Sequence, residues 1–317
     1  MLDYHLHLWP HAQRDADTTL EQVAAYCEQA AAAGVAEVAV TEHLFRFTQA
    51  RDRLDGFWDD LPGDDVLRSG MVAYWDHHAR VDLDTYVEVV EAAKAEGLPV
   101  VLGLEVDYYQ DRMDDVADLL EGYPFDVLLG SVHWLGAWRF DDLDDPPSMG
   151  QWSARRVDDC WTAYTDAMEE LAASGSCDVL AHPDLVKAAG HVPASPTEWW
   201  DRLAEATATH HLAAEVSSAG WRKPVREQYP AHPLLVRLAA RGVPFTTASD
   251  AHRLEQVADR SHELRAMLAS VGVERLQAYR GRRPHTVPLA SPSETASRAA
   301  PHDGVSPARP GEAARES

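Results

Sequence analysis

The stretch Leu2-Asp3-Tyr4-His5-Leu6-His7-Leu8 decides how the rest of the chain is interpreted. It alternates apolar and polar residues, which predicts a β-strand whose alternate side chains share a face. His5 and His7 therefore point the same way, as two ligands of one metal ion would. Two half-buried histidines on the polar face of a strand are the alternative interpretation, because a single H-x-H pattern has low specificity.

Similar apolar runs recur along the chain and alternate with helical patterns. Capping signals at Thr18 with Glu21 and at Ser195 with Glu198 predict two of the helices, and a third is expected over 83–96. Seven short strands separated by helices favour a parallel sheet closed into a barrel. After the first strand, we expect strands over 35–40, 99–105, 125–133, 177–182, 212–217 and 244–249.

Composition limits the possible partners and compartments. The 317 residues carry 52 acidic and 28 basic side chains, and the net charge of −24 argues against nucleic-acid and anionic-membrane partners. No basic leader and no apolar run of about 18 residues is found, so neither a signal peptide nor a membrane span is predicted. The three cysteines are far apart, which predicts unpaired buried thiols and a cytoplasmic protein; they are Cys27, Cys160 and Cys177.

Two segments lack clear periodicity. Residues 44–80 are rich in Asp, Arg, Trp and Gly, and we interpret them as a long loop that could cover a site. From residue 281 onward Pro, Ala, Ser, Arg and Glu dominate, which predicts a disordered tail. The expected organisation is therefore one barrel domain over 1–280 and a tail over 281–317.

Candidate ligands follow the predicted strands at their carboxyl ends, where reactive groups gather in parallel barrels. The set contains imidazoles and carboxylates without thiolates, which suits zinc, manganese or iron. It exceeds what one ion can bind, so two or three ions are predicted, with Glu105 as a bridge. For each residue alone, a hydrogen-bonded buried polar group is the alternative, but eight such residues at one mouth argue against it. The eight are His5, His7, His43, Glu105, His133, His182, Asp250 and His252.

Six short motifs hold these residues. In chain order they are Asp3-Tyr4-His5-Leu6-His7, Thr41-Glu42-His43, Gly103-Leu104-Glu105, Gly130-Ser131-Val132-His133, Ala181-His182-Pro183-Asp184 and Ser249-Asp250-Ala251-His252.

The motifs and their order resemble the PHP (polymerase and histidinol phosphatase) superfamily over about residues 1 to 275. Two longer segments, GSVHWLGAW at 130–138 and SAGWRKPVREQYP at 218–230, are similar to the monofunctional histidinol-phosphatases. The resemblance implies a distorted (β/α)7 barrel with a trinuclear metal centre. It also implies hydrolysis of L-histidinol phosphate to L-histidinol and phosphate in histidine biosynthesis. Another PHP-type phosphoesterase, acting on a nucleotide or another small phosphate ester, is the alternative, and a metal-binding domain without turnover is a more distant one.

The resemblance also implies how the ligands are divided. His5, His7, Glu105 and Asp250 would hold one ion, Glu105, His133 and His182 a second, and His43 and His252 part of a third. Family members place a further His or Asp six residues after the second histidine, where this chain has Gln13. We expect His11 to serve instead, with Asp15 as the substitute.

The expected mechanism uses a metal-bridging hydroxide in line with the phosphorus atom, because two ions lower the pKa of a shared water. Glu105, Asp250, His252 and Arg222 are the predicted catalytic residues, and the fork of Arg222 suits two phosphate oxygens. A solvated surface pair is the alternative for Arg222 and Lys223. Monomer and homo-oligomer both remain open. The predicted substrate-binding residues are Arg80, Asp184, Lys187, Arg222 and Lys223.

Overall fold

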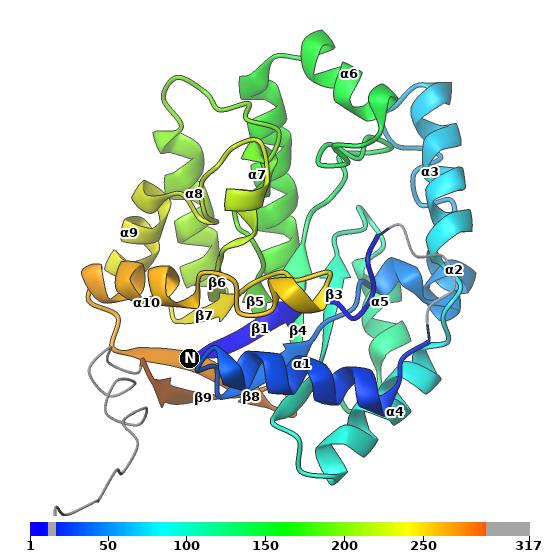
Figure 1. Cartoon of the computed structure of the whole chain (residues 1–317). Helices are drawn as coiled ribbons and strands as arrows, with labels where there is room; N and C mark the ends of the chain where they lie inside the picture. Colours follow the sequence, from blue (N-terminus) through cyan, green and yellow to red (C-terminus); the bar gives the residue numbers. More distant parts are fainter. Residues whose placement is uncertain (12–16, 290–317) are drawn as a thin grey trace, which may run out of the picture.

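Seven parallel strands pair in chain order, β1 to β7, in the computed structural model, which describes residues 1–11 and 17–289 (Figure 1). The barrel closes where β1 meets the end of β7, because the amide of Asp250 donates to His5 O at 2.8 Å and Leu6 bridges to Ala251. The predicted parallel barrel is confirmed. The strands are Leu2–Leu6 (β1), Glu37–Val40 (β2), Val100–Asp107 (β3), Val127–Ser131 (β4), Val179–Leu180 (β5), Ala213–Ser217 (β6) and Phe245–Ala248 (β7).

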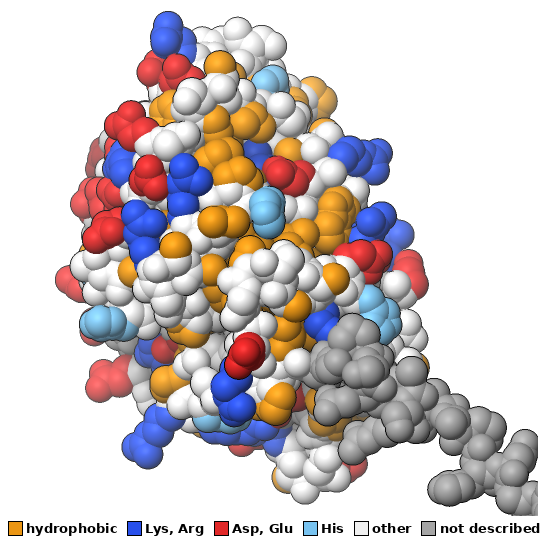
Figure 2. Space-filling model, turned by 90° about the vertical axis from the view of Figure 1, so that its left-hand side faces the viewer, with side chains coloured by type: hydrophobic (Ala, Val, Ile, Leu, Met, Phe, Trp, Pro, Cys, Tyr) orange, Lys and Arg blue, Asp and Glu red, His pale blue; other side chains and the backbone are white. Residues whose placement is uncertain are grey.

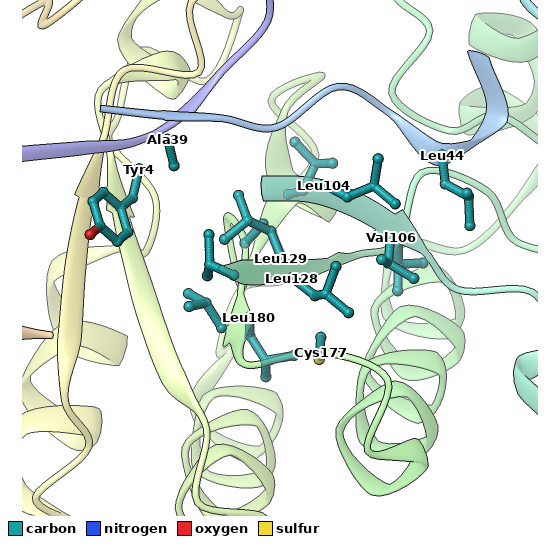
Figure 3. Close-up of a cluster of buried hydrophobic side chains, with 14 of the residues drawn as sticks. Tyr4, Ala39, Leu44, Leu104, Val106, Leu128, Leu129, Cys177 and Leu180 are labelled. Carbon is teal, nitrogen blue, oxygen red and sulfur yellow. The ribbon is translucent and has the colours of Figure 1, made fainter. Parts of the chain in front are cut away.

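The two faces of the strands separate polar from apolar side chains. On β1, Asp3 accepts from Ser249, which directly follows the neighbouring strand β7, and His5 reaches Glu215 of β6, so the odd-numbered residues point inward. Outward-facing residues form the core between strands and helices, where Leu104 and Val106 of β3 lie near Leu128 of β4 (Figure 3). The interior of this barrel therefore carries the candidate ligands. All three cysteines are buried free thiols, as predicted; they are Cys27, Cys160 and Cys177.

Helices cover the outside of the barrel. The N-cap of α1 is Thr19, whose hydroxyl accepts from Gln22 N at 3.2 Å, so the predicted cap at Thr18 is wrong by one residue. The predicted box at Ser195 is also wrong, because Pro196 occupies the cap of α8 without a side-chain hydrogen bond. The covering helices are Leu20–Ala32 (α1), Leu83–Ala95 (α4), Met113–Leu120 (α5), Val157–Ser174 (α7), Thr197–Thr209 (α8), His232–Ala240 (α9) and Ser261–Ser270 (α10).

The segment 44–80 is helical, so its interpretation as a long loop is wrong. It contains the 3-10 turn η1 (Leu44–Arg46) and the helices α2 (Thr48–Leu54) and α3 (Asp65–His78). Asp64 caps α3 through Leu67 N at 2.9 Å, and Leu67, Met71 and Trp75 bury one face at helical spacing. The pattern is obscured because Ser69 and Gly70 interrupt the helical stretch and the apolar residues Val66 and Val72 lie on its exposed side. A further helix, α6 (Pro146–Ala154), begins after Asp145 within the stretch after β4, and α3 and α6 lie on the same side of the molecule (Figure 1).

A hairpin closes the end of the barrel at which the strands begin. The strands β8 (Arg275–Arg280) and β9 (Arg283–Pro288) pair in antiparallel fashion. Gly281 N donates to Asp126 Oδ1 at 2.9 Å, and Tyr279 OH donates to Asp178 O at 3.1 Å, at the amino ends of β4 and β5. The predicted boundary at residue 280 is therefore wrong, because 283–288 belong to the folded domain. The rest of the predicted tail, 290–317, lies outside the described residues.

The face built by α8, α9 and α10 carries acidic and basic side chains next to each other (Figure 2). Ion pairs account for much of this mixture, among them Arg202 with Glu169 at 2.6 Å and Arg241 with Glu205 at 3.1 Å. Within residues 1–11 and 17–289, the helices are too short or too polar to cross a membrane.

Candidate metal centre

Glu105 stands at the centre of the barrel mouth. It belongs to β3, is fully buried, and its two oxygens face different imidazoles. This arrangement is what a carboxylate that bridges two ions requires. Oε2 lies 2.7 Å from His43 Nδ1, 3.2 Å from His5 Nε2 and 3.4 Å from His7 Nε2, whereas Oε1 lies 3.0 Å from His182 Nε2 and 3.4 Å from His133 Nε2.

The predicted ligands converge into overlapping groups. Each group offers ligand atoms that all lie within 4.8 Å of one another. The grouping differs from the implied one in that His182 joins His5, and His133 joins His43 with Asp107. Because the groups share members, the site suits more than one ion. The groups are His7, His43 and His252; His5, Glu105 and His182; His5, His7 and Asp250; and His43, Asp107 and His133.

Unpartnered buried atoms test whether these residues fit metal ions. Among the described residues, both ring nitrogens of His43, Nε2 of His252 and Oε2 of Glu105 are buried without a hydrogen-bond partner. Buried polar atoms are normally hydrogen-bonded, so several electron-pair donors that converge without partners call for cations. The imidazole and carboxylate donors suit divalent ions such as zinc. The residues therefore fit the group that the sequence motifs imply.

His11 lies with the third set of ligands. Its ring stacks on that of His252, with centroids 4.1 Å apart, and lies 5.3 Å from the ring of His43. The structure thus brings His11 to the place where a further ligand is expected. Gln13 and Asp15 lie outside the described residues, so the choice between His11 and Asp15 stays a prediction.

Three carboxylates contact the Nδ1 atoms of predicted ligands, and none of the three was among the predicted site residues. Glu215 Oε2 lies 2.7 Å from His5 Nδ1, and Asp107 Oδ1 lies 2.5 Å from His133 Nδ1. Glu42 accepts from Leu8 N at 2.5 Å and lies 3.6 Å from His7 Nδ1. A carboxylate behind a ring fixes which nitrogen faces the metal. Two features of the sequence could have identified these carboxylates. Asp107 follows Glu105 by two residues, and Glu215 is a charged residue within a mostly apolar strand.

The electrostatics of the cluster set the protonation states that a metal ion would meet. Burial would lower the pKa of His5, but Glu215, Glu105 and Asp250 together raise it well above its usual value. Burial would raise the pKa of Glu105, yet the surrounding imidazoles, His43 first, hold it well below its usual range. Burial lowers the pKa of His43 well below its usual value, so that its ring is neutral. Glu105 is therefore ionised, and the protons that remain on rings are the ones that metal binding would displace.

Arg222 is committed to the backbone of the Asp250 turn. Its Nη2 donates to Ser249 O at 2.6 Å and to Asp250 O at 3.0 Å, and its Nη1 pairs with Asp259 at 2.8 Å. Asp250 has a φ of +50°, which an aspartate adopts at some cost. The guanidinium therefore holds the turn that presents Asp250, and its predicted grip on phosphate would require these bonds to break.

Lys187 and Asp184 pair with each other instead of opening to the mouth. Both are buried, with Lys187 Nζ 3.0 Å from Asp184 and 2.7 Å from Glu227. Asp184 also accepts from Ala231 N at 2.8 Å, so the pair fixes the segment that follows β6. Arg80 is exposed and donates to the carbonyl of Asp76 at 2.9 Å, and the structure does not bring it to the histidines.

Among the residues that the structure describes, two further cations lie near the mouth. The half-buried Lys223 makes no side-chain hydrogen bond or ion pair with residues 1–11 and 17–289, and its charge acts on Asp141. Burial raises the pKa of Asp141, and His133 and Lys223 oppose that rise. Arg46 of η1, which sequence patterns did not single out, is buried 3.5 Å from Glu42. Its position inside a segment interpreted as a loop explains why it was missed.

Known proteins are similar to this chain in sequence. The PHP domain model matches residues 3–219. A "probable histidinol-phosphatase" of Deinococcus radiodurans is 35% identical over 193 residues, which cover 60% of this chain and 73% of that protein.

Two solved structures share the fold. One is the histidinol phosphate phosphatase of Lactococcus lactis, complexed with zinc, L-histidinol and phosphate. It has 19% identity and a TM-score of 0.62, covering 90% of this chain and 98% of that one. The other, a "putative histidinol phosphatase" of Listeria monocytogenes, has 18% identity and a TM-score of 0.65, covering 83% and 99%. The resemblance seen in the motifs is confirmed, and the chain belongs to the PHP domain family.

Proposed function

We propose that this protein is a metal-dependent phosphomonoesterase that hydrolyses L-histidinol phosphate to L-histidinol and phosphate. The observation that carries the proposal is the buried set of unpartnered imidazole and carboxylate atoms around Glu105. The Deinococcus relative, whose name specifies this activity, supports the choice of substrate. Three free thiols fit a reducing compartment, and we propose the cytoplasm.

We propose that the mouth holds two or three divalent ions, with zinc first because the Lactococcus structure contains it. When bound, such ions neutralise phosphate charge and lower the pKa of water, which supplies a nucleophile at neutral pH. Glu105 would contribute one oxygen to each half of the centre. The proposed ligands are His5, His7, His11, His43, Glu105, His133, His182, Asp250 and His252.

The remaining residues position the ligands and the substrate. We assign Arg222 to holding Asp250, because its donors are taken up by that turn. Lys223 is our candidate for the phosphate, since its ammonium has no partner in the described part of the chain. Asp141 is our candidate for the amine of histidinol in place of Asp184, which Lys187 already neutralises.

An aromatic wall next to His43 suits the imidazole ring of the substrate. Phe45 stacks on His43 with ring centroids 4.6 Å apart, and Tyr74 packs on Phe45 at 5.1 Å and on His78 at 4.3 Å. Aromatic faces bind planar rings well. We propose that this wall, built by η1 and α3, receives the leaving group.

A phosphate-release assay over a panel of esters tests the proposal. The purified protein, loaded with zinc or manganese, is given L-histidinol phosphate, a nucleoside monophosphate and glycerol phosphate. We expect turnover of L-histidinol phosphate with the highest kcat/KM, loss after chelation, and recovery when metal returns. Turnover of the nucleotide without turnover of L-histidinol phosphate would overturn the substrate and favour the alternative phosphoesterase. For the amine, Asp141→Asn should raise KM for L-histidinol phosphate and leave that for glycerol phosphate unchanged.

A further inference from the structure

Glu215 lies in the middle of β6 and is fully buried. Glu215 belongs to none of the four groups of candidate ligands described above for the barrel mouth. Each of its oxygens has a different partner, since Oε2 lies 2.7 Å from His5 Nδ1 and Oε1 accepts from the backbone amide of His182 at 3.2 Å. One carboxylate thus contacts two candidate metal ligands that come from different strands.

The first contact decides which nitrogen of His5 faces the centre. An ionised carboxylate only accepts, so Nδ1 must carry a hydrogen, and Nε2 is the nitrogen that offers a lone pair once a metal has displaced the second proton of the ring. Nε2 is the atom that lies 3.2 Å from Glu105 Oε2 and 3.1 Å from His7 Nε2. Glu215 therefore sets His5 in the tautomer that can bind a metal.

The second contact acts on the backbone of His182. This residue has a φ of +27°, a conformation that non-glycine residues rarely adopt and that surrounding contacts must hold. Its amide donates to Glu215, and its carbonyl accepts from Tyr164 OH at 3.3 Å. In this conformation His182 Nε2 lies 3.0 Å from Glu105 Oε1.

We infer that Glu215 is a positioning residue that sets two ligands of the metal centre at once. His5 and His182 lie against different oxygens of Glu105, so one side chain links both halves of the centre. The inference rests on the proposed metal-dependent function, but metal affinity measures it independently of turnover.

Glu215→Gln is the sharpest variant because both partners of Glu215 are donors. A glutamine offers one acceptor oxygen, and its amide nitrogen then faces the other N–H. If the nitrogen faces His182, that amide loses its partner and His5 keeps only a neutral acceptor. If the nitrogen faces His5, the ring moves its proton to Nε2 and His182 keeps only a neutral acceptor. Both ligands are therefore disturbed in either orientation. Asp126→Asn is the matched control. Asp126 is a buried carboxylate that also accepts from two backbone amides, Leu102 N at 3.0 Å and Gly281 N at 2.9 Å, at the opposite end of the barrel.

The experiment titrates zinc against a competing chromophoric chelator on the full chain, with circular dichroism and thermal melting on the same samples. We expect Glu215→Gln to weaken zinc binding about 10- to 100-fold, in at least two equivalents. Asp126→Asn should melt earlier than wild type and bind zinc with wild-type affinity. Wild-type zinc affinity in Glu215→Gln, or a loss in only one equivalent, would overturn the inference.

If Glu215→Gln does not fold, Glu215→Asp takes its place. It keeps the charge but is one methylene too short to hold both contacts, so the same loss in two equivalents is expected. Retained affinity in that variant would overturn the inference. Wild-type protein that binds zinc but releases no phosphate from L-histidinol phosphate would contradict the proposed function and leave the role of Glu215 intact.

Discussion

The two ends of the barrel use buried carboxylates in opposite ways. At the amino ends of the strands, both oxygens of Asp126 accept from backbone amides, and Asp178 accepts from Leu128 N at 2.9 Å. At the carboxyl ends, Glu105 is buried equally well, yet its Oε2 has no hydrogen-bond partner among the described residues. Burial alone therefore does not separate a structural carboxylate from a functional one. The difference lies in whether donors are present to match it.

The largest effect is expected when the unmatched carboxylate is neutralised. Glu105→Gln removes charge from the contact with five imidazoles and should lower kcat/KM by about three orders of magnitude. Bound metal ions would supply several kcal/mol of transition-state charge stabilisation, and a loss of about 1.4 kcal/mol corresponds to a tenfold lower rate. Steady-state kinetics beside metal content checks this. If Glu105→Gln is active and binds its full complement of metal, the proposed distinction between structural and functional carboxylates at the two ends of the barrel is wrong.

Acid should weaken metal binding at the mouth and leave the opposite end unaffected. Burial disfavours the charged ring of His5, but its carboxylate neighbours raise its pKa well above the usual value, so the metal-free ring holds a proton at neutral pH. Metal must displace that proton, and apparent affinity rises as pH rises, by about tenfold per unit for each proton released. Zinc titrations between about pH 6 and pH 8 measure the slope. Affinity that is flat or falls with pH would contradict imidazole ligation.

Loss of the matched carboxylate should affect stability only. Asp126→Asn leaves Leu102 N or Gly281 N facing an amide nitrogen, which should cost about 1 to 3 kcal/mol of unfolding free energy. Chemical denaturation gives that value, and the activity per folded molecule should equal that of wild type. A fall in kcat without a fall in the unfolding free energy would contradict this expectation, because it would give Asp126, at the amino ends of the strands, a functional role.

The smallest effect is expected for Arg80→Ala. Sequence position made Arg80 a candidate for substrate binding, but its exposed guanidinium contacts the carbonyl of Asp76. We expect kcat/KM for L-histidinol phosphate within about twofold of wild type, because this exposed side chain contacts none of the proposed ligands among the described residues. A tenfold rise in KM would return Arg80 to the site.

The sequence predicted the mouth better than its surroundings. Strand ends such as Val40 and Val127 are continuous with apolar runs that local patterning reveals, and the histidines after them share one edge because parallel strands do. The helix α3 was missed because the exposed Val66 and Val72 and the weak helix former Gly70 blur its apolar periodicity, and the hairpin β8–β9 because its residues match turns and tails in composition.

Pairing between distant residues also lay beyond sequence patterns. Nothing local indicates that Arg222 is taken up by the carbonyls of Ser249 and Asp250, or that Lys187 pairs with Glu227. These contacts depend on how the segments that follow β5, β6 and β7 lie side by side. Residue type and strand position could identify the candidate ligands. Only the fold shows whether each basic side chain near the mouth is free or already paired.

Anomalous diffraction at the zinc edge from crystals of the zinc-loaded protein tests the central claim most directly. The two oxygens of Glu105, which face different imidazoles, predict at least two zinc peaks at the barrel mouth, one beside each oxygen, within about 2.0 to 2.2 Å. Zinc peaks confined to the protein surface, or a mouth without any, would contradict the account.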